Sequence, residues 1–132
     1  MPFSRISLPS GEPVDHRAAV ADPLDGALVA CFEVAADDRF RAIHQHKSGE
    51  LIVDRTYRGG PCSDDTIVLP VTTGEPRSAE TKARIDRRLV ENCAESTCVV
   101  PQDVLSAVVG STFEDRSFGS GIHTAAPAGE VR

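Results

Sequence analysis

The feature that most constrains the fold of this chain is a short motif that occurs twice. Ser10-Gly11-Glu12-Pro13 and Thr73-Gly74-Glu75-Pro76 share a Gly-Glu-Pro core, and their glycines are 63 residues apart. Glycine and proline end strands, and proline is well placed in the first turn of a helix. The motif therefore predicts the same change, from strand to helix, at two places in the chain.

The spacing of apolar residues predicts a strand, a helix and a second strand around each copy of the motif. Near the start of the chain, Ile6 and Leu8 fall on one face of a strand and Arg5 and Ser7 on the other, as in a strand with one buried face. After each motif, apolar residues recur at three- and four-residue intervals, as on the buried side of a helix. The predicted elements are a strand over 3–8, a helix to about 32, a strand over 40–46, a strand over 66–72, a helix with Ser78 as its N-cap that frays near 94, and a strand over 104–109.

Two shorter features carry predictions of their own. The apolar triplet Leu51-Ile52-Val53 predicts a short additional strand. Pro70 lies inside the strand predicted over 66–72. Because proline has no backbone N–H to donate, we expect that strand to lie at a sheet edge or to contain a bulge.

The order of these elements predicts an α/β (α+β) fold with a duplicated β-α-β unit. We interpret the chain as a single domain, 1–132, with pseudo-repeats at about 2–46 and 65–112. Each helix is long enough to join two parallel strands by a crossover, which places both helices on one face of one sheet. No third helix is available to cover the other face. A symmetric oligomer that packs sheet against sheet is the expected solution.

Charge and hydropathy exclude several classes of partner. The formal net charge is −6 at pH 7, which disfavours nucleic acid and anionic membranes as partners, although local arginines can still hold a small anion. No apolar run approaches the length of a membrane span, and the first residues lack the basic-then-apolar pattern of an export signal. We therefore expect a cytoplasmic protein with no membrane or nucleic-acid partner.

Neither the cysteines nor the histidines predict a metal site. None of the four cysteines forms a CxxC pair. His44 and His46 share one face of the strand predicted over 40–46, but no third ligand is evident nearby, so we interpret them as part of a polar sheet face. We expect neither a metal nor an organic cofactor.

Pro2 is a candidate catalytic residue, because removal of Met1 would leave it with a terminal secondary amine. A chain-terminal amine titrates at roughly 8 in model peptides, and apolar burial or a nearby cation lowers that pKa. Such an amine acts as a base when neutral and as an acid when charged, and it can also attack a carbonyl. A strand directly after Pro2 would hold the amine rigidly. The alternative interpretation is that Met1-Pro2 is a coincidence and that the terminus is disordered.

Several short segments, taken in order, carry a resemblance to a known family. They are Met1-Pro2-Phe3, Asp37-Asp38-Arg39-Phe40, Gln45-His46, Ser48-Gly49-Glu50-Leu51, Pro76-Arg77-Ser78, Pro101-Gln102-Asp103-Val104 and Ser117-Phe118-Gly119-Ser120-Gly121. In their joint order and spacing the chain resembles the tautomerase superfamily, whose members share an N-terminal proline, a duplicated β-α-β unit and a homotrimer. The resemblance covers nearly the whole chain. It is greatest to the longer bacterial members grouped around malonate semialdehyde decarboxylase.

The resemblance implies a role for four residues. Pro2 would be the catalytic amine. Asp38 matches an acidic residue that helps to position or activate water in the decarboxylase-like members. Arg77 matches an arginine that binds the substrate carboxylate and keeps the pKa of the proline low. Phe118 matches part of an apolar wall over the site.

Two positions depart from the decarboxylase pattern. This chain has Glu75 where that pattern has a second arginine, and Arg116 where it has tryptophan. An anion beside Arg77 should weaken carboxylate binding and raise the pKa of the amine. Arg116 is the candidate that restores a cation to the substrate-binding site, or that pairs with Glu75. The departures favour tautomerase chemistry over decarboxylation.

Three functions follow, in order of preference. The first is an isomerase, a tautomerase that interconverts the enol and keto forms of a small carboxylate-bearing 2-oxo acid, with Pro2 as acid and base and with Arg77 and Arg116 on the carboxylate. The second is a decarboxylase or hydratase similar to malonate semialdehyde decarboxylase, in which Asp38 aligns water. The third is a non-catalytic trimeric binding protein, in which Glu75 has dismantled the site.

Overall fold

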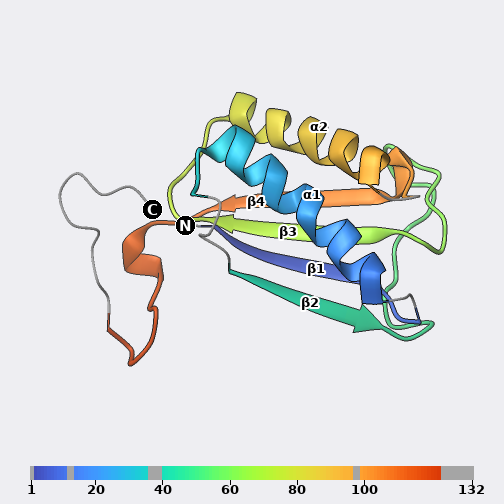
Figure 1. Cartoon of the computed structure of the whole chain (residues 1–132), viewed down its shortest axis with the longest axis horizontal. Coiled ribbons are helices and arrows are strands. Elements are labelled where there is room, and N and C mark those ends of the chain that lie inside the picture. The colour runs from blue at the N-terminus through green and yellow to red at the C-terminus, as the bar shows by residue number, and fades with distance from the viewer. Residues whose placement is uncertain (1, 12–13, 36–39, 97–98, 123–132) are drawn as a thin grey trace.

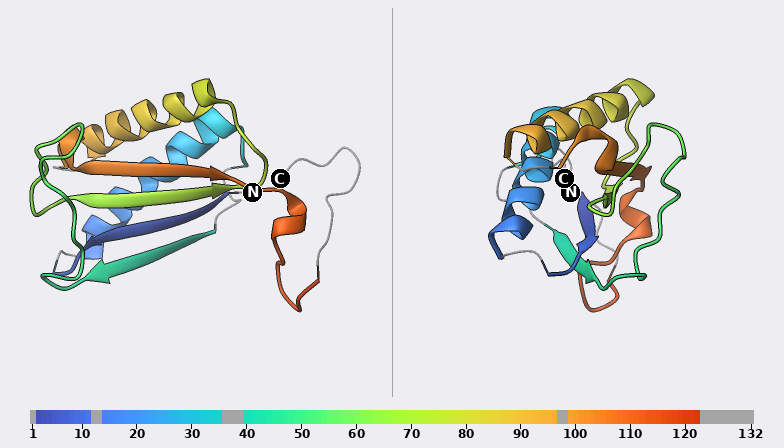
Figure 2. Two further views of the ribbon diagram at one scale, coloured as in Figure 1. Left: turned by 180° about the vertical axis from the view of Figure 1, so that it is seen from behind. Right: turned by 90° about the vertical axis from the view of Figure 1, so that its right-hand side faces the viewer.

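A four-stranded sheet carries two long helices on one of its faces (Figures 1 and 2). The computed structural model describes residues 2–11, 14–35, 40–96 and 99–122. The strands and helices are β1 (Phe3–Pro9), α1 (Val14–Phe32), β2 (Arg41–His46), β3 (Ile67–Thr73), α2 (Ala79–Ser96) and β4 (Val104–Gly110). All six elements predicted around the two motifs are present.

The sheet is built from two strand-helix-strand units. The strand order is β2-β1-β3-β4. β1 pairs with β2 in parallel and β3 pairs with β4 in parallel, while β1 and β3 meet antiparallel at the centre. The predicted fold class is therefore confirmed: one sheet, parallel within each unit, with both helices on the same face. That the units are repeats of one ancestral segment stays a prediction.

Two local predictions are wrong. Pro70 lies in β3, which is a central strand rather than an edge. The β1–β3 ladder pairs Ser4 with Val71 and then Ser7 with Val68, so its pairs pass over Pro70, and the sheet tolerates the missing donor without a bulge in register. Residues 51–53 form no strand, and Ile52 is 86% exposed. An apolar triplet becomes a strand only where a neighbouring strand offers it hydrogen bonds.

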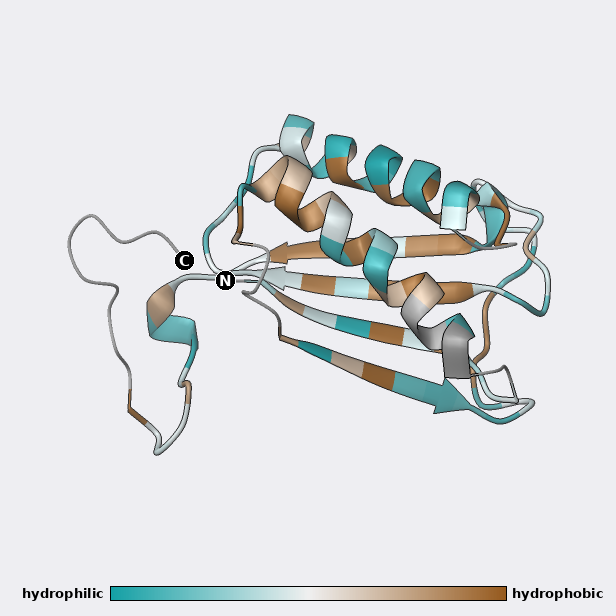
Figure 3. Ribbon diagram, viewed as in Figure 1, coloured by the Kyte–Doolittle hydropathy of each residue, from teal (hydrophilic) through white to brown (hydrophobic). Residues whose placement is uncertain are grey.

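The core lies between the helices and the sheet. Alternation in β1 turns Ile6 and Leu8 inward, where both are fully buried. The stripe of α2 that the sequence predicts, Ile85, Leu89 and Cys93, is buried with no more than 2% of any residue exposed. Figure 3 shows the same division on α2, with hydrophilic residues outward and hydrophobic ones toward the sheet.

Pro23 lies inside α1 and cannot donate a backbone hydrogen bond to the Ala19 carbonyl. The neighbouring helix compensates for this loss. The Ser96 hydroxyl of α2 donates to the Ala19 carbonyl over 2.7 Å, and the Asn92 side-chain amide donates to the Pro23 carbonyl over 3.2 Å. These two bonds tie α2 to α1, and α1 continues through Pro23 to Phe32.

The predicted N-cap of α2 is confirmed, and it provides a first test of the fold. The Ser78 Oγ accepts the backbone N–H of Thr81 at 3.1 Å. Ser78→Ala is expected to lower the free energy of unfolding by about 1 kcal/mol. Ser78→Asp keeps an acceptor at this position and is expected to match wild type within about 0.5 kcal/mol. Urea unfolding followed by circular dichroism measures both, and an unchanged Ser78→Ala midpoint would contradict the capping role.

The face of the sheet that the helices leave open has two halves. Strand alternation and the register of the ladders place small and apolar residues on its β3–β4 half: Val68, Pro70, Leu105, Ala107 and Val109. They place polar residues on its β1–β2 half: Arg5, Ser7, His44 and His46. Val109 is 59% exposed, so the apolar half is open to contact in the single chain.

Among the described residues, no helix combines the length and apolar character needed to cross a membrane.

Candidate functional site

A hollow of about 770 Å³ lies on the open face, at the end of the sheet where β1 begins. Small-molecule sites typically occupy roughly 300–1,000 Å³. The described residues that line the hollow are Phe3, Arg5, Phe40, Ala42, His44, Thr72, Asp115, Arg116, Ser117 and Phe118. Two of the five predicted site residues, Arg116 and Phe118, are therefore brought together here. Apart from their immediate neighbours, the other lining residues precede Arg116 by 44 residues or more in sequence.

Two parallel strands supply one wall of the hollow. In β1 the side chains of Phe3 and Arg5 point away from the helices, because the alternate residues of this strand are buried beneath α1 and α2. Arg5 pairs with Ala42 of β2, and His44 follows on the same face. The sequence pattern already placed Arg5 and His44 on polar strand faces. It did not show that the two strands are neighbours, so these residues were missed as site candidates.

Arg116 forms another part of the hollow and is held in a fixed orientation. Its Nε donates to the Ser111 Oγ over 3.0 Å, and its Nη2 donates to the Thr72 carbonyl over 3.2 Å. The Ser111 hydroxyl in turn donates to the Thr73 carbonyl. Burial lowers the pKa of Arg116 below its ordinary value, although the neighbouring Asp115 opposes this shift. The guanidinium remains charged at neutral pH, since arginine does not deprotonate in proteins.

Two phenylalanines make the apolar part of the site. The ring centroids of Phe40 and Phe118 are 6.2 Å apart, with the ring planes tilted by 58°. Tilted pairs at this separation are favourable for aromatic rings. The rings are nonetheless 42% and 53% exposed, so they offer apolar surface to a ligand or to a partner chain. Phe118 was predicted as a wall residue; Phe40 was not.

Pro2 does not line this hollow, but it is adjacent in sequence to Phe3, which does. It is buried and directly precedes Phe3, which pairs with Thr72 across the β1–β3 ladder. The carbonyl of the same Thr72 accepts the hydrogen bond from Arg116. The start of β1 and the Arg116 guanidinium are thus joined through one residue of β3.

Arg77 lies at the same end of the sheet, since it follows the end of β3 and β3 runs antiparallel to β1. Arg77 is not one of the described residues that line the hollow. Its guanidinium carbon is 5.0 Å from the centroid of the Phe32 ring, a cation–π contact at the end of α1. The Arg77 Nε is buried and has no hydrogen-bond partner among the described residues. A buried donor of this kind calls for an acceptor. Asp38, the fifth predicted site residue, lies outside the described residues.

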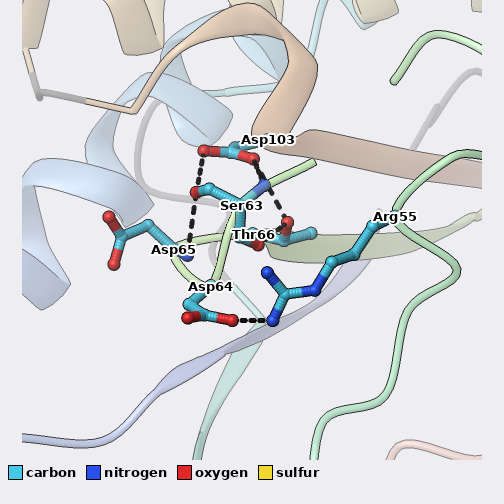
Figure 4. A network of polar contacts seen from close by, with 6 residues as sticks. All are labelled: Arg55, Ser63, Asp64, Asp65, Thr66 and Asp103. Carbon is cyan, nitrogen blue, oxygen red and sulfur yellow. Dashed lines mark hydrogen bonds and ion pairs between the residues drawn. The ribbon is translucent and has the colours of Figure 1, made fainter. Parts of the chain in front are cut away.

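A second hollow, of about 550 Å³, lies at the opposite end of the sheet and is lined by the end of β2 and the loop before β3. None of the five predicted site residues lines it among the described residues. Figure 4 shows what holds this loop: the Asp103 carboxylate accepts bonds from the Ser63 backbone N–H at 2.7 Å and from the Ser63 hydroxyl at 2.6 Å, and Arg55 is paired with Asp64. We interpret this end of the molecule as structural.

Comparison with known proteins agrees with the fold. The sequence profile of the family described as "Tautomerase enzyme" matches residues 38–119. "Probable tautomerase YrdN" and "Probable tautomerase YusQ" of Bacillus subtilis (strain 168) are each 27% identical to this chain over 121 residues. These alignments cover 92% of this chain and 93% and 95% of the two relatives.

Solved structures give the same result. A malonate semialdehyde decarboxylase structure superposes with a TM-score of 0.83 at 30% identity, covering 92% of this chain and 93% of the other. A fused 4-OT symmetric trimer superposes with a TM-score of 0.72 at 16% identity, covering 92% of this chain and 94% of the other, and shares the fold. The family profile spans more than half of this sequence, and the decarboxylase aligns over nearly all of it. This chain belongs to the tautomerase family.

Proposed function

We propose that this protein is a cofactor-independent isomerase, a tautomerase that interconverts the enol and keto forms of a small carboxylate-bearing 2-oxo acid. One observation carries the proposal: in a chain of the tautomerase family, Pro2 directly precedes the strand that borders a hollow containing an anchored arginine and two exposed aromatic rings. Once Met1 is removed, Pro2 is a secondary amine that takes a proton from the enol hydroxyl or from a carbon and returns it to the other position.

The neighbouring residues take the roles that this reaction needs. Arg116 binds the substrate carboxylate and stabilises the negative charge that develops on the enolate. Arg77, with its unpaired buried Nε, contributes a second positive charge at this end of the sheet and keeps the pKa of the amine low. Phe118 covers the apolar part of the substrate. Asp38 is proposed to assist through water, as the family resemblance implies.

We also propose that the protein is a homotrimer. The apolar β3–β4 half of the open sheet face needs a cover, and a second copy of the chain, which carries the same apolar face, is the cover that we propose. The fused 4-OT structure, which shares the fold, is a symmetric trimer. Light scattering or native mass spectrometry of the purified protein measures the oligomeric state directly, and a stable monomer would contradict this part of the proposal.

The function is tested by the ketonisation of phenylenolpyruvate, an enol whose conversion is followed by absorbance. The wild-type protein is expected to accelerate the reaction over buffer and over heat-inactivated protein. A second candidate function, decarboxylation or hydration, is favoured by the 30% identity to malonate semialdehyde decarboxylase. Release of carbon dioxide from malonate semialdehyde, or a hydrated product from an acetylenic 2-oxo acid, without ketonisation activity would favour that second function.

Replacing Arg116 separates substrate binding from general stability. Arg116→Met is expected to raise KM for phenylenolpyruvate about 10- to 100-fold, because a charged hydrogen bond to the carboxylate contributes about 1.5–3 kcal/mol. Arg87→Met, an exposed change on α2 away from the hollow, is the matched control and is expected to leave KM within about twofold. Equal KM values in wild type and Arg116→Met would remove Arg116 from the site.

A further inference from the structure

We infer that Ser111 is a positioning residue, whose hydroxyl holds the Arg116 guanidinium in the orientation that binds the substrate carboxylate. The inference rests on the proposed function and adds a residue to that same site. Ser111 lies outside every segment that carries the family resemblance, and it is not among the described residues that line the hollow. Its effect on a ligand therefore has to pass through Arg116.

Arg116 lies beyond the last strand, on a segment that leaves the sheet. Figures 1 and 2 show this segment turning away from the end of β4 through the short 3-10 helix η2 (Phe113–Asp115). The described residues after Gly110 form no strand. The Arg116 backbone N–H donates to the Phe113 carbonyl over 3.3 Å, which closes η2 but does not tie it to the sheet. Side-chain contacts are therefore what fixes the guanidinium relative to the strands.

Two of these contacts fix the plane of the Arg116 guanidinium. Its Nε donates to the Ser111 Oγ over 3.0 Å, and its Nη2 donates to the Thr72 carbonyl over 3.2 Å. Both nitrogens belong to one rigid, planar group. Acceptors at these two positions define where the group lies and how its plane is turned. Loss of the Ser111 hydroxyl removes one of the two constraints.

The Ser111 hydroxyl is itself held by β3. It donates its proton to the Thr73 carbonyl, so its lone pairs face the donor on Arg116. Thr73 is the last residue of β3 and is only 1% exposed, which makes it a fixed anchor. The carbonyls of Thr72 and Thr73 are consecutive in β3. Both hold Arg116, the first directly and the second through Ser111.

A close approach at Gly110 keeps Ser111 within reach of Thr73. Gly110 is the register partner of Thr73 in the β3–β4 ladder. A Cβ atom at Gly110 would lie 3.1 Å from the Pro76 Cα, which is tighter than ordinary van der Waals contact. Glycine at this position therefore allows the end of β4 to lie against the turn that follows β3. Ser111 is the next residue of the chain and makes its bond to Thr73 from there.

Ser111→Ala is expected to raise KM for phenylenolpyruvate about 3- to 10-fold, the range that one hydrogen bond provides, and to leave kcat within about threefold. Ser111→Thr keeps the hydroxyl and is expected to return KM to within about twofold of wild type. An unchanged KM in Ser111→Ala, or a loss that Ser111→Thr does not restore, overturns the inference.

Ser106→Ala is the matched control for the loss of a serine hydroxyl. Ser106 lies in β4 and is half-buried like Ser111. Its hydroxyl donates to the Asp86 carboxylate over 2.6 Å, on the helix side of the sheet and away from the hollow. Ser106→Ala is expected to leave KM and kcat within about twofold of wild type. A rise in KM as large as that of Ser111→Ala would overturn the inference, because any lost hydroxyl would then have the same effect.

A double-mutant cycle shows whether Ser111 acts through Arg116. In the Arg116→Met background, Ser111→Ala is expected to change KM by less than about twofold, because the guanidinium that Ser111 orients is absent. A purely structural role for Ser111 would lower activity by the same factor in both backgrounds. A further rise in KM of about threefold or more in the double variant therefore overturns the inference.

Ligand binding tests the same point without catalysis. 3-Phenylpropanoate and 3-phenylpropanamide have nearly the same shape, but only the first is charged. In chemical-shift titrations, Ser111→Ala is expected to raise Kd for the carboxylate about 3- to 10-fold and to leave Kd for the amide within about twofold. Equal losses for the two ligands, or a loss for neither, overturn the inference.

Failure of the proposed function gives a different result. Wild type and Pro2→Ala would then ketonise phenylenolpyruvate at the same rate, whatever the titrations show. Ketonisation that depends on Pro2 and on Arg116 but not on Ser111 refutes the role of Ser111 alone.

Discussion

Pro2→Ala is expected to lower kcat/KM for phenylenolpyruvate ketonisation by about 10²–10⁴-fold, the usual contribution of a positioned acid–base group. Alanine at this position still offers a terminal amine after removal of Met1. That amine is primary, however, and alanine lacks the ring that fixes the backbone angle and holds the nitrogen beside the hollow. Stopped-flow absorbance at several pH values separates a loss of rate from a shift in the pKa of the amine.

Pro9→Ala is the matched control for this substitution. Pro9 lies at the opposite end of β1 and lines the other hollow, so its replacement tests the effect of losing a proline from this strand without touching the candidate site. It is expected to leave kcat/KM within about twofold of wild type. Equal rates in wild type and Pro2→Ala would leave the non-catalytic binding protein as the surviving hypothesis.

Asp103→Ala is expected to lower the free energy of unfolding by about 3 kcal/mol, because it removes charge-assisted hydrogen bonds at a residue that is only 3% exposed. The carboxylate accepts from the Ser63 backbone and hydroxyl, and the Thr66 hydroxyl lies 3.2 Å from Oδ1 (Figure 4). Removal leaves these donors without their acceptor and frees the loop that enters β3. Chemical denaturation at pH 7 measures the loss. Asp65→Ala, an exposed neighbour in the same loop, is expected to stay within about 0.5 kcal/mol.

The same residue predicts a pH dependence of stability. Burial alone would raise the pKa of Asp103, but the hydrogen bonds from Ser63 and Thr66 outweigh burial and lower the pKa below its ordinary value of 3.8. A depressed carboxyl pKa stabilises the fold above the unfolded pKa, and this stabilisation is lost as pH falls through the folded pKa. The stability difference between wild type and Asp103→Asn is therefore expected to be constant near neutrality and to shrink below the ordinary value. A difference that grows toward acid pH would contradict this.

Much of the fold could be predicted because its elements have strong local signals. The stripe of Ile85, Leu89 and Cys93 has helical spacing, Ser78 precedes it as a cap, and both are found as expected. The prediction that the strand containing Pro70 lies at an edge or has a bulge was wrong. The sequence shows that Pro70 lacks a backbone N–H, but it does not show which neighbouring strand would have accepted that hydrogen bond. The strand predicted at 51–53 is absent, because strand formation depends on a partner strand that lies elsewhere in the chain.

The candidate site was less predictable than the fold. Arg116 and Phe118 were identified through the family resemblance, and both line the hollow. Arg5 and His44 carry no motif; they become neighbours through the β1–β2 register, which the sequence does not specify. Asp103 was noticed as part of a family segment, yet its bonds to Ser63 span 40 residues and depend on how the loop folds back. Contacts of this kind come from tertiary structure rather than local pattern.

The most direct measurement for the role of Pro2 is the intact mass of the purified, active protein. Catalysis by Pro2 requires a free secondary amine, since an amide nitrogen is not basic at any relevant pH. We expect active material to be lighter than the printed sequence by one methionine residue, with Pro2 at its start. Full ketonisation activity in protein that still carries Met1 on every molecule would contradict the proposed mechanism, while leaving the two-unit sheet and its hollow unchanged.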